Sequence, residues 1–451
     1  MSPLGLCYDQ LMRSNRSNEA YEKAVCKLES ICPLGIRLGL RRVRQLLKAM
    51  GNPEETFRAI IVGGTNGKGS VAAMVSSILK EGGYRVGRYT SPHLFEYTER
   101  MVVGERPVSR ERFVEAVRSA ERATQRVRRV HPRFQITEFE FLTAMAFWIF
   151  SKEKVDIAVL EVGLGGRLDA TNVVRPLASI ITHVDFDHMD RLGKRLGQIA
   201  TEKAGIIHRG IPVITACTRP EALRVLVQQA KEKKAPFFHI YKDLGYEFVA
   251  HEHLTKYSRI RVWGKQKRYP WLSFPLKGAF QIPNLLCVLA LFELLPSLGI
   301  SLSAIQRGLS KTTWPGRFEI VSKKPLIILD IAHNPSGARG LGETLSLFRL
   351  RVVLVLAVQV TKDAKGIVRA LAPHADSMIA TSVSNIPCTS PRVLSKAAQA
   401  CGVSTSETSS LHRALKLAVS AFPAICVTGS LYTVSEAKRV LAELGYKKAM
   451  C

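Results

Sequence analysis

The 451-residue sequence has no apolar run of membrane-spanning length, since its best stretch, Ala144–Phe150, is far too short. The N-terminus lacks a basic region followed by an apolar core, so we expect no secretion signal. Nine cysteines, an odd number without paired or metal-type spacing, disfavour a disulfide framework or a structural zinc site. We therefore expect a cytoplasmic protein with reduced thiols and no membrane partner.

Acidic residues are scarce, with 37 Asp and Glu against 65 Lys and Arg and a net charge of +28. Such an excess attracts anionic ligands and raises non-specific affinity for nucleic acid. However, basic clusters such as Arg126, Arg128 and Arg129 are short, dispersed and not interleaved with aromatic residues. We expect solvated basic faces or an anionic small-molecule substrate, and no specific nucleic-acid partner.

The length favours two domains, and apolar β-branched runs alternate with helical patterns. This alternation predicts an α/β protein with a doubly wound, mostly parallel sheet. Residues 238–274 depart from it and predict an antiparallel insertion. Trp314-Pro315-Gly316 ends a helix, and a second α/β series follows. We predict an ATP-binding domain over residues 1–314 and a smaller Rossmann-like domain over 315–451.

The most informative segment is a predicted strand, Ala59–Val62, followed by a glycine-rich turn and an apolar helical pattern. Such a turn presents backbone N–H groups and a helix N-terminus to a phosphate, while Lys68 adds a charge and Ser70 a hydroxyl for Mg²⁺. A glycine-rich turn that binds nothing is the alternative. The residues expected to contact nucleotide here are Asn66, Gly67, Lys68, Gly69 and Ser70.

Polar residues follow two further predicted strands. Glu161 ends one strand and is well placed to hold Mg²⁺, although a purely structural glutamate is the alternative. His188 lies among three aspartates over 185–190, and this pattern is typical of either a metal site or a helix cap. Taken alone, Lys203 is typical of a solvated helix end and Arg317 of a surface residue.

The ordered motifs closely resemble the folylpolyglutamate synthase/dihydrofolate synthase branch of the Mur ligase family. The resemblance extends over most of the chain, from Leu38 to Tyr432. The matching motifs are Gly64–Ser70, Thr90–Leu94, Thr137–Glu140, Glu161–Asn172, Asp187-His188, Glu202–Ile206, Gly316–Glu319 and Asp330–Pro335. The resemblance implies an ATP-dependent amide ligase that adds L-glutamate to dihydropteroate or to reduced folates through an acyl phosphate.

The resemblance also implies roles for individual residues. Lys68, Lys203, His188 and His333 are the expected catalytic residues, with Lys203 carboxylated by CO₂. One Mg²⁺ is expected at Ser91 and Glu161, beside Ser70, and a second at His188. The expected ATP contacts are Asn284, Arg317 and Asp330, and Ser430 joins His333 at the glutamate end. The segments that match a pteroate pocket and favour a bifunctional enzyme are Leu38-Gly39-Leu40, Thr137-Glu138-Phe139-Glu140 and Leu168-Asp169-Ala170.

The sequence departs from the family at two sites outside the phosphate loop. Phe280 occupies a usual histidine position, and Thr361 replaces an aspartate in the loop that keeps Lys362 and Asp363. Two other functions remain as alternatives, namely a Mur-type ligase for another carboxylate and an ATPase stimulated by nucleic acid. We expect a monomer whose partners are ATP, L-glutamate and a pteroate or folate.

Overall fold

The computed structural model describes residues 18–32, 35–249, 254, 258–264, 267–384 and 386–446. The chain divides into two compact units. Unit 1 consists of Met1–Val184, His188–Lys242 and Cys287–Gly308, and unit 2 of Asp185–Asp187, Asp243–Leu286 and Leu309–Cys451. Our predicted boundary at residue 314 divides the chain into two continuous segments. The two units instead group residues by contact, so each unit contains segments that are distant in sequence.

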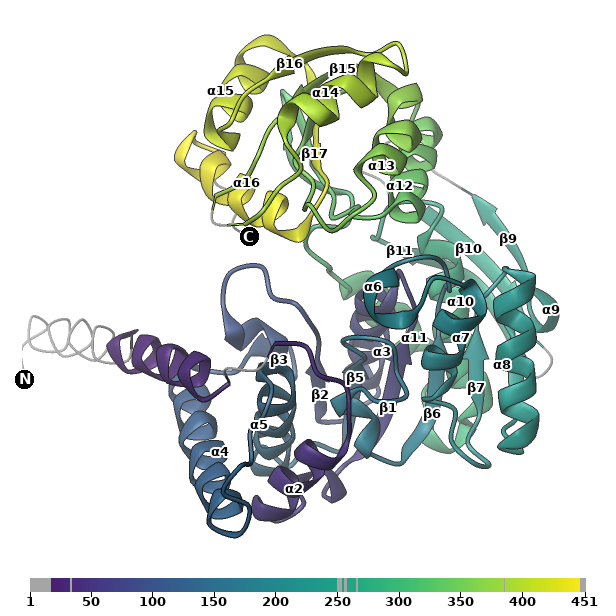
Figure 1. Cartoon of the computed structure of the whole chain (residues 1–451). Helices are drawn as coiled ribbons and strands as arrows, with labels where there is room; N and C mark the ends of the chain where they lie inside the picture. Colours follow the sequence, from purple (N-terminus) through teal and green to yellow (C-terminus); the bar gives the residue numbers. More distant parts are fainter. Residues whose placement is uncertain are drawn as a thin grey trace, which may run out of the picture. The chain divides into compact units, whose positions relative to one another are not determined.

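The first unit contains an eight-stranded sheet in the order β4-β3-β2-β5-β1-β6-β7-β8 (Figure 1). All pairings are parallel except those of β3 with β2 and β4. The strands are β1 (Arg58–Gly63), β2 (Val86–Tyr89), β3 (Met101–Val103), β4 (Arg106–Pro107), β5 (Ile157–Glu161), β6 (Pro176–Ile181), β7 (Val213–Thr215) and β8 (Phe237–His239). The predicted mostly parallel sheet is confirmed.

Strand β1 lies at the point where the strand order reverses. It pairs with β5 on one side, where Val62 lies opposite Glu161, and with β6 on the other, where Gly63 lies opposite Ile181. Ligands of open parallel sheets bind beyond the carboxyl ends of the strands at such a switch point. The glycine-rich turn leaves β1 at this position.

Helices cover both faces of this sheet because its central strands are apolar on both sides. One face packs with five helices, namely α2 (Arg41–Ala49), α4 (Arg110–Val130), α5 (Glu138–Lys152), α7 (Leu196–Ala204) and α8 (Pro220–Glu232). Helix α3 (Lys68–Glu81) packs against β1, β2 and β5, and Gly308 of α11 (Leu302–Lys311) lies against Ile78 of α3. Short helices α6 (Met189–Leu192) and α9 (Ile240–Asp243) and a helix over 18–31 complete the unit, with α10 (Gln281–Leu294) passing from unit 2 into unit 1.

The second unit contains two sheets (Figure 1). The predicted antiparallel insertion is confirmed as β11-β10-β9, with β9 (Gly245–Val249), β10 (Ser258–Trp263) and β11 (Arg268–Phe274). The six-stranded sheet β12-β13-β17-β14-β15-β16 is parallel except for β12. Its strands are β12 (Glu319–Lys323), β13 (Leu326–Leu329), β14 (Val352–Leu356), β15 (Ala375–Ala380), β16 (Ser404–Glu407) and β17 (Ala424–Thr428). Its helices are α12 (Pro335–Leu347), α13 (Ala364–Leu371), α14 (Pro391–Gln399), α15 (Leu411–Ala421) and α16 (Leu431–Glu443).

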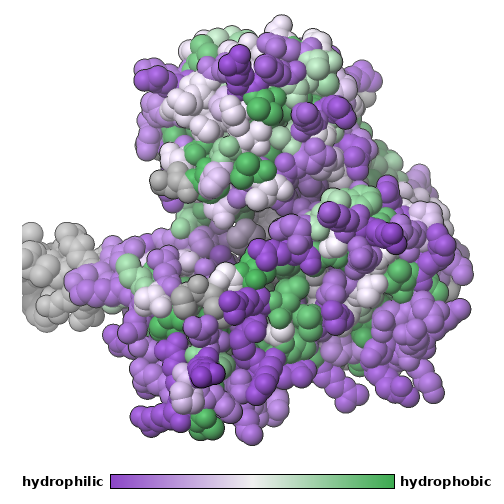
Figure 2. Space-filling model, in the orientation of Figure 1, coloured by the Kyte–Doolittle hydropathy of each residue, from purple (hydrophilic) through white to green (hydrophobic). Residues whose placement is uncertain are grey.

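Hydrophilic side chains cover much of the face drawn in Figure 2. Among the described residues, two basic side chains are buried, namely Lys438 in unit 2 and Lys203 in unit 1. Lys438 pairs with Glu319 at 2.8 Å, as a buried cation requires. No helix in the described ranges is long and apolar enough to cross a membrane. The burial of Lys203 distinguishes it from the solvated basic residues.

Candidate active site

The glycine-rich turn after β1 is held by Thr182 and His183, which directly follow the neighbouring strand β6. Thr65 N–H donates to His183 O at 2.6 Å, and the Thr182 hydroxyl lies 2.7 Å from Asn66 O and 3.1 Å from Gly63 O. Gly64 has φ of +134°, and a Cβ there would lie 1.9 Å from Thr182 Oγ1. Only glycine fits this position without displacing neighbouring atoms. The turn is therefore a rigid loop that leads into the N-terminus of α3.

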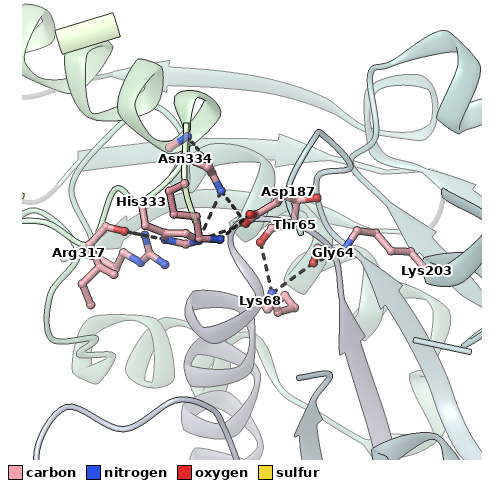
Figure 3. A network of polar contacts seen from close by, with 11 residues as sticks. Gly64, Thr65, Lys68, Asp187, Lys203, Arg317, His333 and Asn334 are labelled. Atoms are coloured by element: carbon pink, nitrogen blue, oxygen red, sulfur yellow. Dashed lines mark hydrogen bonds and ion pairs between the residues drawn. The ribbon is translucent and has the colours of Figure 1, made fainter. Parts of the chain in front are cut away.

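Two lysines contact the same carbonyl of this loop (Figure 3). Lys68 Nζ lies 3.2 Å from Gly64 O and 3.3 Å from Thr65 O. Lys203 Nζ, from α7, lies 2.8 Å from the same Gly64 O, and the Lys203 residue is 5% exposed. Since they share one oxygen at 2.8 and 3.2 Å, the two nitrogens lie within about 6 Å of each other. Lys203 is thus a buried part of the loop environment and not a solvated helix end.

The structure brings Ser91 and Glu161 together. Glu161 ends β5 beside the glycine-rich turn, is 6% exposed, and its Oε2 accepts a hydrogen bond from Ser91 N–H at 3.2 Å. Ser70, in the first turn of α3, is 2% exposed. Burial lowers the pKa of the neighbouring Arg88 to about 10, while the negative charge of Glu161 opposes this shift. Carboxylate and hydroxyl oxygens are hard ligands of the kind that Mg²⁺ prefers, so a magnesium site at Glu161, Ser91 and Ser70 stays a prediction.

His188 lies at the N-terminus of α6 in a left-handed conformation with φ of +48°, and its side chain makes no cap hydrogen bond. The neighbouring Asp185 instead accepts from Phe186 N–H at 2.9 Å. Within the described ranges, no group of three or more His, Cys, Asp and Glu side chains is arranged to hold a metal ion. A metal-binding role for His188 stays a prediction.

The three segments expected at a pteroate pocket lie around one region of unit 1. Gly39 N–H donates to Leu168 O at 3.2 Å, which joins the first and third segments. Phe139, from the second segment, packs on Tyr89 with ring centroids 6.0 Å apart. A Cβ at Gly163 would lie 2.6 Å from the Phe139 ring, so Gly163 makes room for this ring. The structure thus groups segments of which the first and third lie about 130 residues apart in the chain.

Several polar side chains of these segments have structural partners. Thr137 and Glu140 form a capping box at the start of α5, and Arg42 of α2 lies 2.9 Å from Glu140 Oε1. Asp169 is buried and accepts hydrogen bonds from Leu164 N–H at 2.9 Å and Thr171 N–H at 3.0 Å. Burial raises the pKa of Asp169. The side chains of Glu140 and Asp169 therefore hold the walls of the region in place.

In unit 2, Arg317 and Asp330 come together after β13. Asp330 is 2% exposed, and its Oδ2 accepts from Phe318 N–H at 2.8 Å. Burial raises the Asp330 pKa to about 6, although Arg317 and two backbone N–H groups favour the charged form. Arg317 Nη1 lies 3.5 Å from Ile331 O, so its guanidinium stays beside this turn. The pair places one buried acid and one half-buried base at the carboxyl edge of the six-stranded sheet.

Asp187, which the sequence marked only as part of the Asp187-His188 motif, is the centre of a polar cluster in unit 2 (Figure 3). Its carboxylate lies 2.6 Å from Lys362 Nζ, 3.0 Å from Asn334 Nδ2 and 3.3 Å from His333 Nε2. His333 Nδ1 lies 3.0 Å from Ile331 O, so both ring nitrogens face oxygen atoms. The motifs over residues 185–190 and 330–335 could be recognised in the sequence, but the contacts between them could not.

The other expected residues of unit 2 are buried. Ser430 is 2% exposed and caps α16 by accepting from Thr433 N–H at 3.0 Å. Asn284 donates to Gln281 Oε1 at 2.9 Å within α10. Phe280 lies beside Gly278 and Gly340, where an added Cβ would meet its ring at 2.5 and 3.3 Å. The aromatic departure at residue 280 is therefore packed against glycines of its own unit.

Two family models match the chain, one before and one after residue 314. The family model for the Mur ligase middle domain matches residues 137–292, and the model for the Mur ligase glutamate ligase domain matches residues 316–431.

Three relatives illustrate the similarity at full length. The dihydrofolate synthase/folylpolyglutamate synthase of Bacillus subtilis is 34% identical over 429 residues, covering 94% of this chain and 99% of that protein. A probable dihydrofolate synthetase of Schizosaccharomyces pombe is 36% identical over 426 residues, covering 90% and 99%. The structure of Mycobacterium tuberculosis folylpolyglutamate synthase complexed with ADP has a TM-score of 0.86 at 30% identity, covering 94% and 98%.

Proposed function

The chain belongs to the folylpolyglutamate synthase/dihydrofolate synthase family of Mur ligases, and we propose that it uses ATP to join L-glutamate to a pteroate or folate carboxylate. The observation that carries the proposal is the rigid loop Gly64–Gly67, followed by Lys68 at the start of α3 and flanked by Glu161 on the next strand. Such a loop offers backbone N–H groups and positive charge to phosphates.

In the proposed reaction, the substrate carboxylate attacks the γ-phosphate of ATP and forms an acyl phosphate and ADP. The amino group of glutamate then displaces phosphate and forms the amide. Phosphoryl transfer depends on positioning and charge neutralisation. Lys68 and the loop N–H groups hold the phosphates, and Arg317 and Asp330 are proposed ATP contacts together with Asn284.

Mg²⁺ would neutralise charge on the transferred phosphoryl group when bound. We propose that Ser91 and Glu161 hold one ion beside Ser70, supported by the 3.2 Å contact that joins Glu161 to Ser91. A second ion at His188 rests on the family resemblance.

We also propose that Lys203 is carboxylated on Nζ. The ammonium group first loses a proton, and the neutral amine then attacks CO₂, forms a carbamate N–C bond and releases a second proton, so that a cation becomes an anion. Two lysine cations no more than about 6 Å apart repel each other by at least about 3 kcal/mol at an effective dielectric constant of 20. Removal of the positive charge from buried Lys203 eliminates this repulsion, and this is the physical support for the modification.

The pteroate group is proposed to bind along Leu38–Leu40, Thr137–Glu140 and Leu168–Ala170, whose contacts in unit 1 support a shared pocket. His333 and Ser430 are the proposed residues at the glutamate end. The S. pombe relative is named for dihydrofolate synthesis alone, whereas the B. subtilis relative is named for both reactions. We favour the bifunctional enzyme, and a cytoplasmic monomer remains our prediction from sequence.

The deciding experiment is mass spectrometry of the product formed with ATP, Mg²⁺ and L-glutamate. Parallel reactions contain dihydropteroate or tetrahydrofolate. A glutamate increment on both substrates, with release of ADP, supports the bifunctional enzyme. An increment on tetrahydrofolate alone leaves a polyglutamate synthase, and none on either contradicts the folate assignment and favours a ligase for another carboxylate.

Lys68→Ala tests the phosphate loop. We expect loss of ligation with an unchanged melting temperature, because Lys68 contacts the loop and no packed core. Lys80→Ala is the matched control, since Lys80 lies on the same helix and is paired with surface residue Glu105. Turnover retained by Lys68→Ala would contradict the phosphate-loop assignment.

A further inference from the structure

Lys203 is the penultimate residue of α7, a helix of nine residues. The last carbonyl groups of a helix have no partners within the helix, and a short helix frays at its ends. The buried Nζ of Lys203 nevertheless lies 2.8 Å from Gly64 O. The position of Lys203 against the phosphate loop therefore depends on what holds the C-terminus of α7.

The residues directly after α7 donate to the carbonyl groups of Glu202, Lys203 and Ala204, and the loop over residues 163–172 adds further contacts at this end of the helix. Arg167 N–H donates to Glu202 O at 2.8 Å, and the Arg167 guanidinium donates twice to Glu202 Oε1, at 2.7 and 3.1 Å. Asn172 Nδ2 donates to Gly205 O at 3.0 Å and to Arg167 O at 3.3 Å. The loop thus binds the last turn of α7 through Glu202 and the C-cap residue through Gly205 O.

Two glycines bring this loop and the helix into close contact. A Cβ at Gly205 would lie 2.2 Å from Arg167 Cβ, and a Cβ at Gly166 would lie 2.9 Å from Glu202 O. Backbone atoms on both sides leave no room for an added methyl group, so the loop and the end of α7 move together. The amide of Asn172 lies across this contact.

His208 completes the arrangement. Its Nε2 lies 2.8 Å from Asn172 Oδ1. Because Asn172 Nδ2 faces two carbonyl oxygens, its Oδ1 must accept, and His208 therefore donates from Nε2. Asn172 is 7% exposed, so each of its three polar contacts forms away from bulk water.

We propose that Asn172, oriented by His208, is a positioning residue that fixes Lys203 against the phosphate loop by capping the C-terminus of α7. The inference rests on the proposed function, since it takes Lys203 to act in ligation. Asn172 and His208 have no role of their own in the phosphate loop. Each acts through the backbone that carries Lys203. A displacement of about 1 Å in such a group is sufficient to reduce turnover about 100-fold.

The test compares Asn172→Ala with Thr201→Ala in the full-length enzyme. Thr201 donates to Gly197 O on the exposed side of the same helix, so its variant loses one helix contact without altering the cap. Asn172→Ala should lower kcat about 10- to 100-fold with KM for ATP changed less than about threefold. Thr201→Ala should keep both constants.

A second readout reports on Lys203 directly. Reductive methylation in CO₂-free buffer, in which Lys203 Nζ is a free amine, followed by mass spectrometry should label Lys203 slowly in the unaltered enzyme, because the residue is 5% exposed. Labelling should rise several-fold in Asn172→Ala and stay unchanged in Thr201→Ala. A residue that only supports the fold would lower the melting temperature without changing this labelling selectively.

His208 separates the positioning role from misfolding. His208→Ala should lower kcat about threefold to tenfold, and His208→Gln should restore it because a glutamine amide also donates to Asn172 Oδ1. If Asn172→Ala does not fold, His208→Ala and His208→Gln test the inference in its place. A wild-type kcat and wild-type labelling of Lys203 in His208→Ala would then overturn the inference.

Lys203→Ala distinguishes the inference from the function on which it rests. If Lys203→Ala is active, the proposed role of Lys203 is wrong. If Lys203→Ala is inactive while Asn172→Ala keeps wild-type kcat and labelling, the inference alone is overturned.

Discussion

Asp330 offers a test in which the sign of a stability change follows from burial. Its carboxyl has an ordinary pKa of 3.8, and burial raises this to about 6 in the folded protein. Between these two pH values the folded state binds more protons than the unfolded state, so stability falls as pH rises. Above about pH 6 the full penalty is present, and it amounts to about 3 kcal/mol for a shift of about two pKa units.

We therefore expect Asp330→Asn to be more stable than the unaltered protein at pH 7.5. The amide oxygen still accepts from Phe318 N–H, but the loss of one backbone hydrogen bond and of the Arg317 contact offsets about 1 kcal/mol. The net gain should be about 1 to 2 kcal/mol. It should shrink by about 1 kcal/mol between pH 7.5 and pH 5, since the wild-type carboxyl then takes up its proton.

The measurement is urea-induced unfolding, monitored by a probe within residues 309–451, at several pH values between 5 and 8. Asp376→Asn is the control, because Asp376 lies on β15 of the same sheet and forms an exposed ion pair with Arg351. A gain independent of pH, or lower stability of Asp330→Asn at pH 7.5, would refute the reasoning. Loss of ATP binding in the more stable variant would indicate that Asp330 is retained for its ligand.

Three further perturbations test unit 1. Gly64→Ala should lower stability by about 2 kcal/mol or more and weaken ATP binding, because the added Cβ would meet Thr182 Oγ1. Gly83→Ala is the control for backbone strain alone, since Gly83 also has a positive φ but no atom within 4 Å of an added Cβ. Equal losses of stability in the two variants on thermal denaturation would contradict the clash. Glu161→Gln should raise the Mg²⁺ concentration for half-maximal activity at least tenfold, and an unchanged Mg²⁺ titration would argue against Glu161 as a ligand. Arg42→Ala should lower the free energy of urea unfolding by about 2 to 3 kcal/mol, because it leaves the buried Glu140 carboxylate with its capping-box contacts but without a cationic partner. A second change, Glu140→Gln, should recover part of the loss, and additive losses in the double variant would contradict this pairing.

Local patterns were sufficient for the strand, glycine-rich turn and helix over residues 58–81 and for the fold class. Buried strands such as Ala59–Val62 are apolar on both faces, and the glycines after them have few conformational alternatives, so sequence neighbours alone indicate a strand, a turn and a helix. The motif order from Gly64 to Asp330 was sufficient for the family, which the comparisons confirm.

The sequence could not show which residues of distant segments each side chain contacts. Lys203 alone has the pattern of a solvated helix end, and only the packing of α7 against the turn buries it on Gly64 O. Thr137 and Glu140 read as pocket residues, yet the fold uses their side chains to cap α5 and to pair with Arg42.

The sequence by itself therefore determined the strands, the glycine-rich turn and the family, because these depend on residues within a few positions of each other. Tertiary structure decided the environment of each side chain. Asp187 gathers Lys362 and His333, and Asn172 caps a helix that begins more than twenty residues later, through contacts that close long chain loops. Burial and shared hydrogen-bond partners, which set charge and geometry at the site, arise only when these loops close.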